Sequence, residues 1–191
     1  MPKIIDRDKY RNELAEKAAP LFSKYGYNGL GMRAIAKEIG LSKSALYHYF
    51  PTKEAFFLAC TDSVTNFDKN LSGTHQFPDN DEPIEGRLTK LFGVMTAMDN
   101  EFPKELSLIV DYLRGRSKAD VANDPSMNLS NKRFEGLIGQ FVDKQDVKPV
   151  LCLLMGTLLM RYFDGGKTEL AEIETWLQSV IKHSTNTVSP P

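Results

Sequence analysis

The stretch from residue 32 to residue 53, MRAIAKEIGLSKSALYHYFPTK, constrains the fold most, because it predicts two short helices joined by a tight turn. The first helix has apolar residues at helical spacing and is followed by Gly40, the residue type that most often ends a helix in a left-handed conformation. Ser42 is a favourable N-cap for a second helix from Lys43 to about Phe50. A glycine turn between two short helices is typical of a helix-turn-helix.

The second helix of this pair has one polar and one apolar face. At about 100° per residue, one arc carries a cation, hydroxyl groups and an imidazole, and the opposite arc is mainly apolar. Each polar residue alone could equally be an ordinary surface or packing residue, but together they suit a helix that lies in the major groove of DNA. The polar arc consists of Lys43, Ser44, Tyr47 and His48, and the other arc of Ala45, Leu46, Tyr49 and Phe50.

The distribution of charge supports nucleic-acid binding, although the net charge of −1 alone does not. Residues 1–54 contain ten Lys or Arg and six Asp or Glu, a balance of +4, whereas the other 137 residues have a balance of −5. A basic N-terminal segment on an acidic body is the pattern expected when one small module binds DNA.

Composition indicates an ordinary globular protein, since 41% of the 191 residues are hydrophobic and 26% are charged. Cys60 and Cys152 both lie in apolar helical patterns, which predicts buried free thiols rather than a disulfide or a zinc site, and we expect no cofactor. The N-terminus lacks the apolar core of a signal peptide, and the longest apolar run, 150–160, is about half of what spans a bilayer. We therefore expect a cytoplasmic protein with no membrane partner.

Every strong pattern is helical, so the sequence predicts an all-α protein of about nine helices. Residues 1–51 are expected to form a three-helix helix-turn-helix DNA-binding domain, and residues 52–191 a helical bundle for ligand binding and dimerisation. The segments 72–83 and 117–127 are expected to be a turn-rich linker and a loop. Helices are predicted from Asp6 or Asp8 to Tyr25, over 32–39 and 43–50, from Thr52 to about Phe67, and over 83–99, 102–115, 128–143, 147–164 and 168–184.

Residues 26–57, GYNGLGMRAIAKEIGLSKSALYHYFPTKEAFF, resemble the DNA-binding signature of the tetracycline-repressor (TetR) family of bacterial regulators. The family pattern contains a Gly-aromatic turn, an Ile-Ala pair, Gly-Leu-Ser, Leu-Tyr-x-aromatic-Phe and Thr-Lys-Glu. Here these elements begin at Gly26, Ile35, Gly40, Leu46 and Thr52, and the resemblance covers roughly residues 8–60. Because so many offsets agree at once, the resemblance is specific.

Two positions depart from the family pattern. Gly31 stands where Thr or Ser usually caps the second helix and can touch a phosphate, so the hydroxyl is lost although glycine remains a tolerated cap. Ser44 stands where glycine often lets the backbone approach a base. The resemblance therefore implies the same fold but a different operator sequence.

The resemblance also implies which residues touch DNA. Lys53 is expected to hold a phosphate, whereas Arg33 and Ser44 are better suited to reading base edges. The basic residues Lys3, Arg7, Lys9 and Arg11 are either further backbone or minor-groove contacts or a solvated arm. The expected DNA-binding residues are Arg33, Ser42, Lys43, Ser44, Tyr47, His48, Tyr49 and Lys53.

The two last predicted helices are candidates for self-association. The segment 150–163 is apolar almost all round, and the last helix carries one apolar stripe. The resemblance implies that these helices form a four-helix bundle between two copies of the chain; the alternative is that both are core helices of a monomer. The expected interface residues are Leu153, Gly156, Met160, Trp176, Leu177 and Val180.

The middle helices are rich in Met and Phe, which suits a pocket for a mostly apolar small molecule. The resemblance implies such a pocket, but the same residues could simply form a core. Asp111, Arg114 and Arg161 could orient a ligand or be surface ions. The expected pocket residues are Phe67, Phe92, Met95, Ile109, Tyr112, Leu113, Phe134, Ile138 and Phe141.

Together the pattern and the resemblance imply a transcriptional repressor that binds a pseudo-palindromic operator as a homodimer and responds to a small, mostly apolar effector. The fourth helix is the expected lever between pocket and DNA. The alternative is a DNA-binding dimer without an effector. An enzyme is not expected, since no catalytic triad, metal-ligand spacing or phosphate loop occurs and His48, His75 and His183 are scattered.

Overall fold

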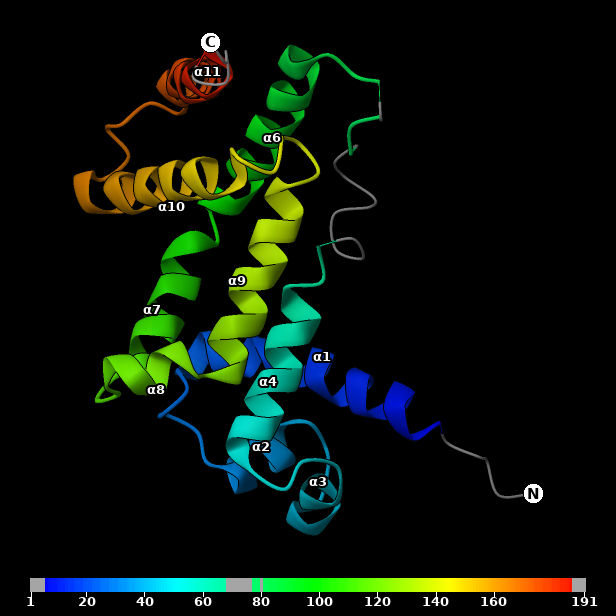
Figure 1. Ribbon diagram of the computed structural model, residues 1–191. Coiled ribbons are helices and arrows are strands. Elements are labelled where there is room, and N and C mark those ends of the chain that lie inside the picture. Colours follow the sequence, from blue (N-terminus) through cyan, green and yellow to red (C-terminus); the bar gives the residue numbers. More distant parts are fainter. Residues whose placement is uncertain (1–5, 68–76, 80, 187–191) are drawn as a thin grey trace. The chain divides into compact units, whose positions relative to one another are not determined.

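The computed structural model describes residues 6–67, 77–79 and 81–186, and all regular structure within these ranges is helical (Figure 1). This confirms the predicted all-α fold. The described helices are α1 (Arg7–Tyr25), α2 (Met32–Glu38), α3 (Lys43–Tyr49), α4 (Lys53–Val64), α6 (Ile84–Asp99), α7 (Phe102–Leu113), α8 (Lys118–Ala122), α9 (Pro125–Ile138), α10 (Val147–Asp164) and α11 (Leu170–Asn186).

The first helices begin where the sequence predicts, because side-chain caps define their N-termini. Asp6 accepts hydrogen bonds from the backbone N–H groups of the first turn of α1, and Thr52 accepts one from Ala55 at the start of α4. Gly31 caps α2 without any side-chain hydrogen bond, as its lack of a hydroxyl predicts.

The predicted loop 117–127 is wrong, because it contains α8 and the start of α9. Ser117 and Asp120 form a reciprocal capping box that starts α8. Asp124 then accepts a hydrogen bond from the backbone N–H of Met127, and Pro125 occupies the first position of α9, where a missing N–H costs nothing. The predicted helix 128–143 also ends too late, since α9 stops at residue 138.

By their internal contacts the residues divide into two compact units that are interleaved along the chain. The N-terminal unit consists of residues 1–66 and 104–131, and the C-terminal unit of residues 67–103 and 132–191. Helices α7 and α9 each contribute residues to both units. The predicted boundary between residues 51 and 52 separates a DNA-binding domain from a ligand-binding domain by function. The two compact units are defined by packing and do not test that boundary.

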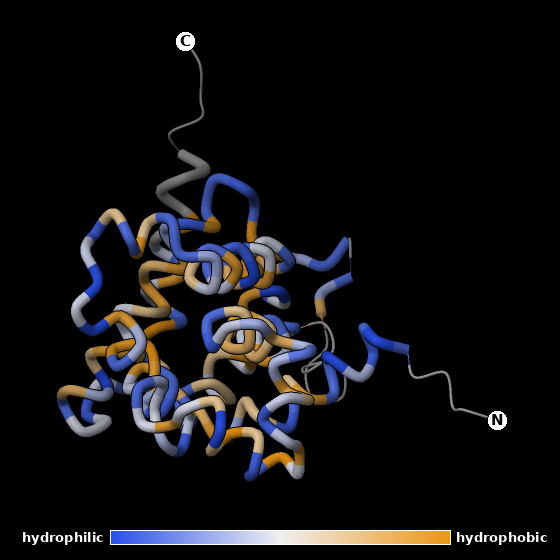
Figure 2. The backbone as a smooth tube through the Cα atoms, turned by 90° about the horizontal axis from the view of Figure 1, so that it is seen from below, coloured by the Kyte–Doolittle hydropathy of each residue, from blue (hydrophilic) through white to orange (hydrophobic). Residues whose placement is uncertain are grey.

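In the N-terminal unit, α1 packs against α4 and α2 against α3, around buried aromatic rings. The ring of Phe22 lies 5.2 Å from that of Phe57 and 6.1 Å from that of Phe56, both in edge-on geometry. Figure 2 shows hydrophobic and hydrophilic residues alternating along the helices, as expected when each helix buries one face.

In the C-terminal unit, α11 packs against α6 and α10, and Ile173 and Leu177 of α11 are fully buried. Arg161 of α10 makes a bidentate ion pair with Asp99 of α6 and also donates to the carbonyl of Thr168 in the loop before α11. Arg161 therefore fastens three segments of this unit. Within the described residues, no helix is long and apolar enough to cross a membrane.

Candidate functional site

Helix α3 is held by a buried face and by the turn before it. Leu46 and Phe50 are fully buried. Leu41 donates its backbone N–H to the carbonyl of Ala36 at 2.8 Å, and Gly40, with φ of 78°, donates to the carbonyl of Lys37. These two bonds form a Schellman motif, which needs the left-handed conformation that glycine adopts most easily. The turn thus fixes the direction in which α3 leaves α2.

The opposite face of α3 is an exposed polar arc formed by Ser42, Lys43, Ser44, Tyr47 and His48. The ammonium group of Lys43 lies 5.5 Å from the centroid of the Tyr47 ring, and the hydroxyls of Ser42 and Ser44 are 3.0 Å apart. The side chain of Ser42 also accepts the N–H of Ala45 and so caps α3. The predicted polar face is therefore present and open, and its contacts with DNA stay a prediction.

Tyr49 differs from the other predicted DNA-binding residues of α3. It is half-buried, and its ring packs edge-on against Tyr10 of α1 at 5.2 Å. The His48 ring lies against it, also at 5.2 Å. The main observed role of Tyr49 is therefore to pack α3 onto α1, as the helical wheel indicates.

A basic depression lies beside the start of α3. Its lining carries three cations, Arg33, Lys37 and Lys43, and no acidic residue among the described ones. Lys37 is absent from the predicted site because it reads as part of a solvated charge run. Its position four residues after Arg33 puts both on one face of α2, and that spacing is the signal that could have identified it.

Lys53 starts α4 and is half-buried. Its ammonium group lies 4.4 Å from the centroid of the Tyr27 ring, and the Tyr27 hydroxyl donates to the Glu54 carboxylate at 3.0 Å. Burial lowers the pKa of Lys53, while the charges of Glu54 and Asp111 oppose that shift. The cation is thus pre-positioned at the N-terminus of α4, which suits a phosphate contact.

Two of the basic N-terminal residues, Arg7 and Arg11 in the first turns of α1, contact α3 and the residue that follows it. Arg7 donates to the backbone carbonyl of His48 at 3.4 Å, and the guanidinium of Arg11 lies 5.0 Å from the ring centroid of Phe50. Lys3 lies outside the described residues. Arg7 and Arg11 therefore help to position α3.

The turn between α1 and α2 is held by Asp111 of α7. This carboxylate accepts the backbone N–H of Asn28 at 2.8 Å, and the Asn28 amide donates to the Asp111 carbonyl at 2.9 Å. The backbone N–H bond, together with a 3.3 Å hydrogen bond from the Asn28 amide to the other carboxylate oxygen, lowers the pKa of Asp111. Gly26 has φ of 75°, and a Cβ there would come within 2.8 Å of the Asp111 carboxylate, so the close approach requires glycine.

Tyr112, the next residue of α7, is the centre of an aromatic and ionic cluster. Its ring stacks on Phe57 at 4.4 Å and meets Tyr27 edge-on at 4.7 Å. Its hydroxyl donates to the buried carboxylate of Asp124 at 2.6 Å, and Arg116 pairs with the same carboxylate at 2.9 Å. Burial and this hydrogen bond raise the pKa of Tyr112 to about 12.

Comparison with known proteins identifies the helix-turn-helix. Residues 14–60 match the family described as bacterial regulatory proteins, tetR family. The chain carries a TetR-family DNA-binding domain. The transcriptional regulator PksA of Bacillus subtilis is 46% identical over 54 residues, which are 28% of this chain and 26% of that protein. The repressor AcnR of Corynebacterium diphtheriae is 39% identical over 49 residues, 26% of each protein. The aligned segment thus spans about a quarter of these TetR-family relatives.

Solved TetR-family structures share the fold of nearly the whole chain. A TetR-family member from Streptomyces coelicolor has a TM-score of 0.66 at 16% identity and covers 92% of this chain and 98% of its own. The multidrug binding protein EbrR, complexed with imidazole, has a TM-score of 0.69 at 14% identity over 95% of this chain and 94% of its own. Further EbrR structures contain proflavin, ethidium or malachite green.

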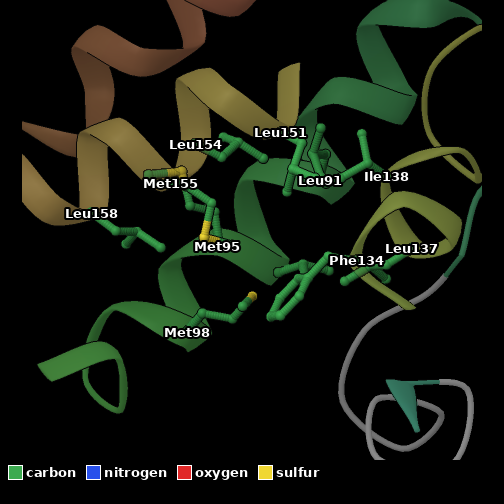
Figure 3. A pocket seen from close by; sticks show the side chains of 11 residues that line it. Leu91, Met95, Met98, Phe134, Leu137, Ile138, Leu151, Leu154, Met155 and Leu158 are labelled. Atoms are coloured by element: carbon green, nitrogen blue, oxygen red, sulfur yellow. The ribbon is translucent and has the colours of Figure 1, made fainter. Parts of the chain in front are cut away.

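The C-terminal unit of the chain contains a small apolar cavity between α6, α9 and α10, with a volume of about 20 Å³ (Figure 3). Its lining carries no polar side chain, and three methionines contribute to it. The lining residues are Leu91, Val94, Met95, Met98, Phe134, Leu137, Ile138, Leu151, Leu154, Met155 and Leu158.

The predicted pocket residues separate into three groups. Those that line the cavity are Met95, Phe134 and Ile138. Those that pack in the same core without lining it are Phe67, Phe92 and Phe141. Those that belong instead to the N-terminal unit are Ile109, Tyr112 and Leu113. Tyr112 cannot line this cavity, because its ring is enclosed by Phe57 and Tyr27. Asp111 and Arg161, proposed ligand-orienting residues, are engaged in the contacts described above.

Helix α10 is apolar on nearly every side, but only one face is buried within its own unit, and the other face carries an exposed strip. The strip consists of Cys152, Gly156, Met160 and Phe163, at spacings of four, four and three residues, and the Phe163 side chain is 70% exposed. Cys152 is thus exposed, not buried as expected, whereas Cys60 is buried.

The remaining predicted interface residues differ in exposure. Trp176 of α11 is exposed and Leu153 is half-buried. The prediction that Leu177 belongs to a dimer interface is wrong, because its side chain is fully buried in the core of its own unit and cannot contact a partner. The side chain of Val180 lies outside the described residues.

Proposed function

We propose that this protein is a transcriptional repressor that binds a pseudo-palindromic operator as a homodimer and is released by a small apolar effector. The exposed polar arc of α3, seated on a buried face beside a basic depression, is the observation that carries the proposal. Helices of this kind read base edges in the major groove, and surrounding cations bind phosphates. The relatives include a repressor, AcnR, and an activator, FasR of Mycolicibacterium smegmatis, so repression is itself part of the proposal.

A dimer is proposed because one helix-turn-helix buries too little surface for tight and selective binding. The strip of Cys152, Gly156, Met160 and Phe163 on α10 supports a self-association surface, with Trp176 on α11 as a further exposed ring. In a two-fold dimer the same strip would serve both partners, and each copy would present one α3 to one half-site.

Replacing Phe163 with glutamate tests this dimer. Because the ring is largely exposed, the substitution should leave the fold intact, yet it would bring two like charges into an apolar interface. We expect the dimer dissociation constant to rise about 100-fold or more, measured by sedimentation, with operator affinity falling in parallel. Val110→Glu is the matched control, since Val110 of α7 is also a large exposed apolar residue. A Phe163→Glu protein that remains a dimer would contradict the assignment.

The Lys53 contact can be tested through salt dependence. Lys53→Ala should lower affinity for operator and for unrelated DNA alike, and reduce the slope of log affinity against log salt by about one, the change expected for one lost phosphate contact. Lys24→Ala is a matched control, because Lys24 also stacks on a tyrosine, Tyr25, at 4.8 Å, but at the end of α1. An unchanged slope for Lys53→Ala would argue against a phosphate contact.

The effector is proposed to bind in the apolar cavity of the C-terminal unit. It can shift the protein away from the DNA-binding state only by its difference in affinity for the two states. Besides α4, α7 is a candidate to carry that shift, because Asp111 and Tyr112 contact the α1–α2 turn and α4 within the N-terminal unit.

A second candidate function is a DNA-binding dimer without an effector, and the small cavity volume of about 20 Å³ favours it. Footprinting the protein on the DNA that flanks its own gene, and then adding candidate effectors, separates the two functions. If no apolar compound relieves the protection of the DNA, the result supports the DNA-binding dimer without an effector.

A further inference from the structure

We propose that the cavity between α6, α9 and α10 selects uncharged apolar molecules and discriminates against organic cations. This inference rests on the proposed function, since it names the chemical class of effector that the same site would accept. It differs from what two of the solved EbrR complexes contain, because proflavin and ethidium are both cationic dyes.

Among the described residues, the lining provides no side chain that could stabilise a positive charge by a hydrogen bond or an ion pair. The eleven side chains around the cavity are those of Leu, Val, Ile, Met and Phe. A cation moved from water into such surroundings loses its hydration without gaining a partner. Phe134 is the single aromatic residue in the described part of the lining, which therefore offers no aromatic cage of the kind that binds quaternary ammonium groups.

One carboxylate beside the lining, that of Asp99, is already neutralised by Arg161. Asp99 directly follows Met98 of the lining, and Arg161 lies three residues after Leu158. The two make a bidentate pair, with Nη2–Oδ2 at 2.9 Å and Nε–Oδ1 at 3.1 Å. A cationic ligand that recruited Asp99 would leave Arg161 half-buried without that partner, which is costly.

The cavity also indicates how a ligand would enter. At about 20 Å³ it has room for roughly one water molecule, so any organic ligand must displace side chains. Met95, Met98 and Met155 come from two of the three helices and extend toward this space in Figure 3. Methionine adapts to new surroundings more easily than branched residues do. The site is therefore expected to admit apolar molecules by rearrangement of its methionines.

A pair of probes with the same tricyclic ring tests this proposal on the full chain. Acridine is uncharged at slightly alkaline pH, whereas proflavin, a diaminoacridine, is a cation. Calorimetric titration is expected to show acridine binding at least about tenfold more tightly than proflavin. In a separate measurement, acridine should release the protein from its operator.

Two substitutions of the half-buried Met155 locate the binding site. Met155→Glu places a carboxylate in the lining and is expected to reverse the preference toward proflavin. Met155→Gln has nearly the same shape without the charge, so it should weaken acridine binding without any gain for proflavin. Circular dichroism of both variants shows whether each retains its helices.

The outcomes distinguish this inference from the proposed function. If proflavin binds the unaltered protein as tightly as acridine and releases the operator, the selectivity inference is overturned while the effector function stands. If neither probe binds, the selectivity inference is overturned, whereas the effector function fails only if no apolar compound relieves the operator protection. If acridine binds but neither Met155 variant changes its affinity, the assignment to this cavity is overturned.

Discussion

Replacing Tyr47 with alanine is expected to lower operator affinity by about 100-fold, which corresponds to about 2.7 kcal/mol and lies within the range for one specific contact in the groove. Tyr47 is 39% exposed in the middle of the polar arc of α3, and its described ring contact is the Lys43 ammonium group at 5.5 Å. Its removal should therefore cost the free protein little stability. Affinity is measured by titration of labelled operator, and the unfolding transition is recorded for the same sample.

Tyr25→Ala is the matched control for this experiment. Tyr25 at the end of α1 has a similar exposed fraction, 42%, and a similar lysine contact, with Lys24 at 4.8 Å. It should leave operator affinity nearly unchanged. Tyr47→Phe then separates the hydroxyl from the ring. If the Tyr47→Ala protein binds the operator as tightly as the wild type, the assignment of Tyr47 as a DNA contact is contradicted.

Replacing Tyr112 with alanine is expected to lower the free energy of unfolding by about 3–5 kcal/mol, the usual cost of truncating a large buried aromatic residue. The Tyr112 side chain stacks on Phe57 and meets Tyr27, so its loss leaves a cavity between α7, α4 and the α1–α2 turn. Urea unfolding followed by circular dichroism measures the change.

Tyr112→Phe separates ring packing from the hydroxyl. The ring contacts remain, but the buried carboxylate of Asp124 loses the donor at 2.6 Å while keeping Arg116. We expect a loss of about 1–2 kcal/mol, clearly smaller than for alanine. A loss of unfolding free energy below about 1 kcal/mol for Tyr112→Ala would contradict the central role of the ring in this cluster.

The helix-turn-helix could be predicted in detail because its signals are local. Ser42 and Thr52 cap the helices that follow them, and Gly40 makes the Schellman motif that its residue type indicates. The exposed arc of α3 follows directly from helical periodicity once the helix limits are known. Each of these features depends on residues within a few positions of one another.

The role of Tyr112 could not be predicted, because it depends on partners far away in sequence. An apolar stripe indicates that a side chain is buried but not what it packs against, and here the partners are Tyr27 and Phe57. Leu177 shows the same limit, since its stripe on α11 suits an interface and a core equally well.

Helix α10 shows a related difficulty. Its sequence is apolar on nearly every side, so periodicity alone cannot tell which face meets α6 and α11 and which stays open. Only the packed structure distinguishes buried Leu154 and Leu158 from the exposed strip that includes Met160 and Phe163.

The interleaving of the two units bears on how this protein could be re-engineered. Asp111 and Tyr112 lie in the segment 104–131 but complete the packing of the first 66 residues. A fragment that ends at residue 66 would lack the Asp111 carboxylate that holds the turn at Asn28. It would also lack Tyr112, so the rings of Tyr27 and Phe57 would be exposed to water. A hybrid sensor that keeps this DNA specificity would therefore need to carry residues 104–131 with it, and to join foreign sequence after residues 66 and 131 and before residue 104.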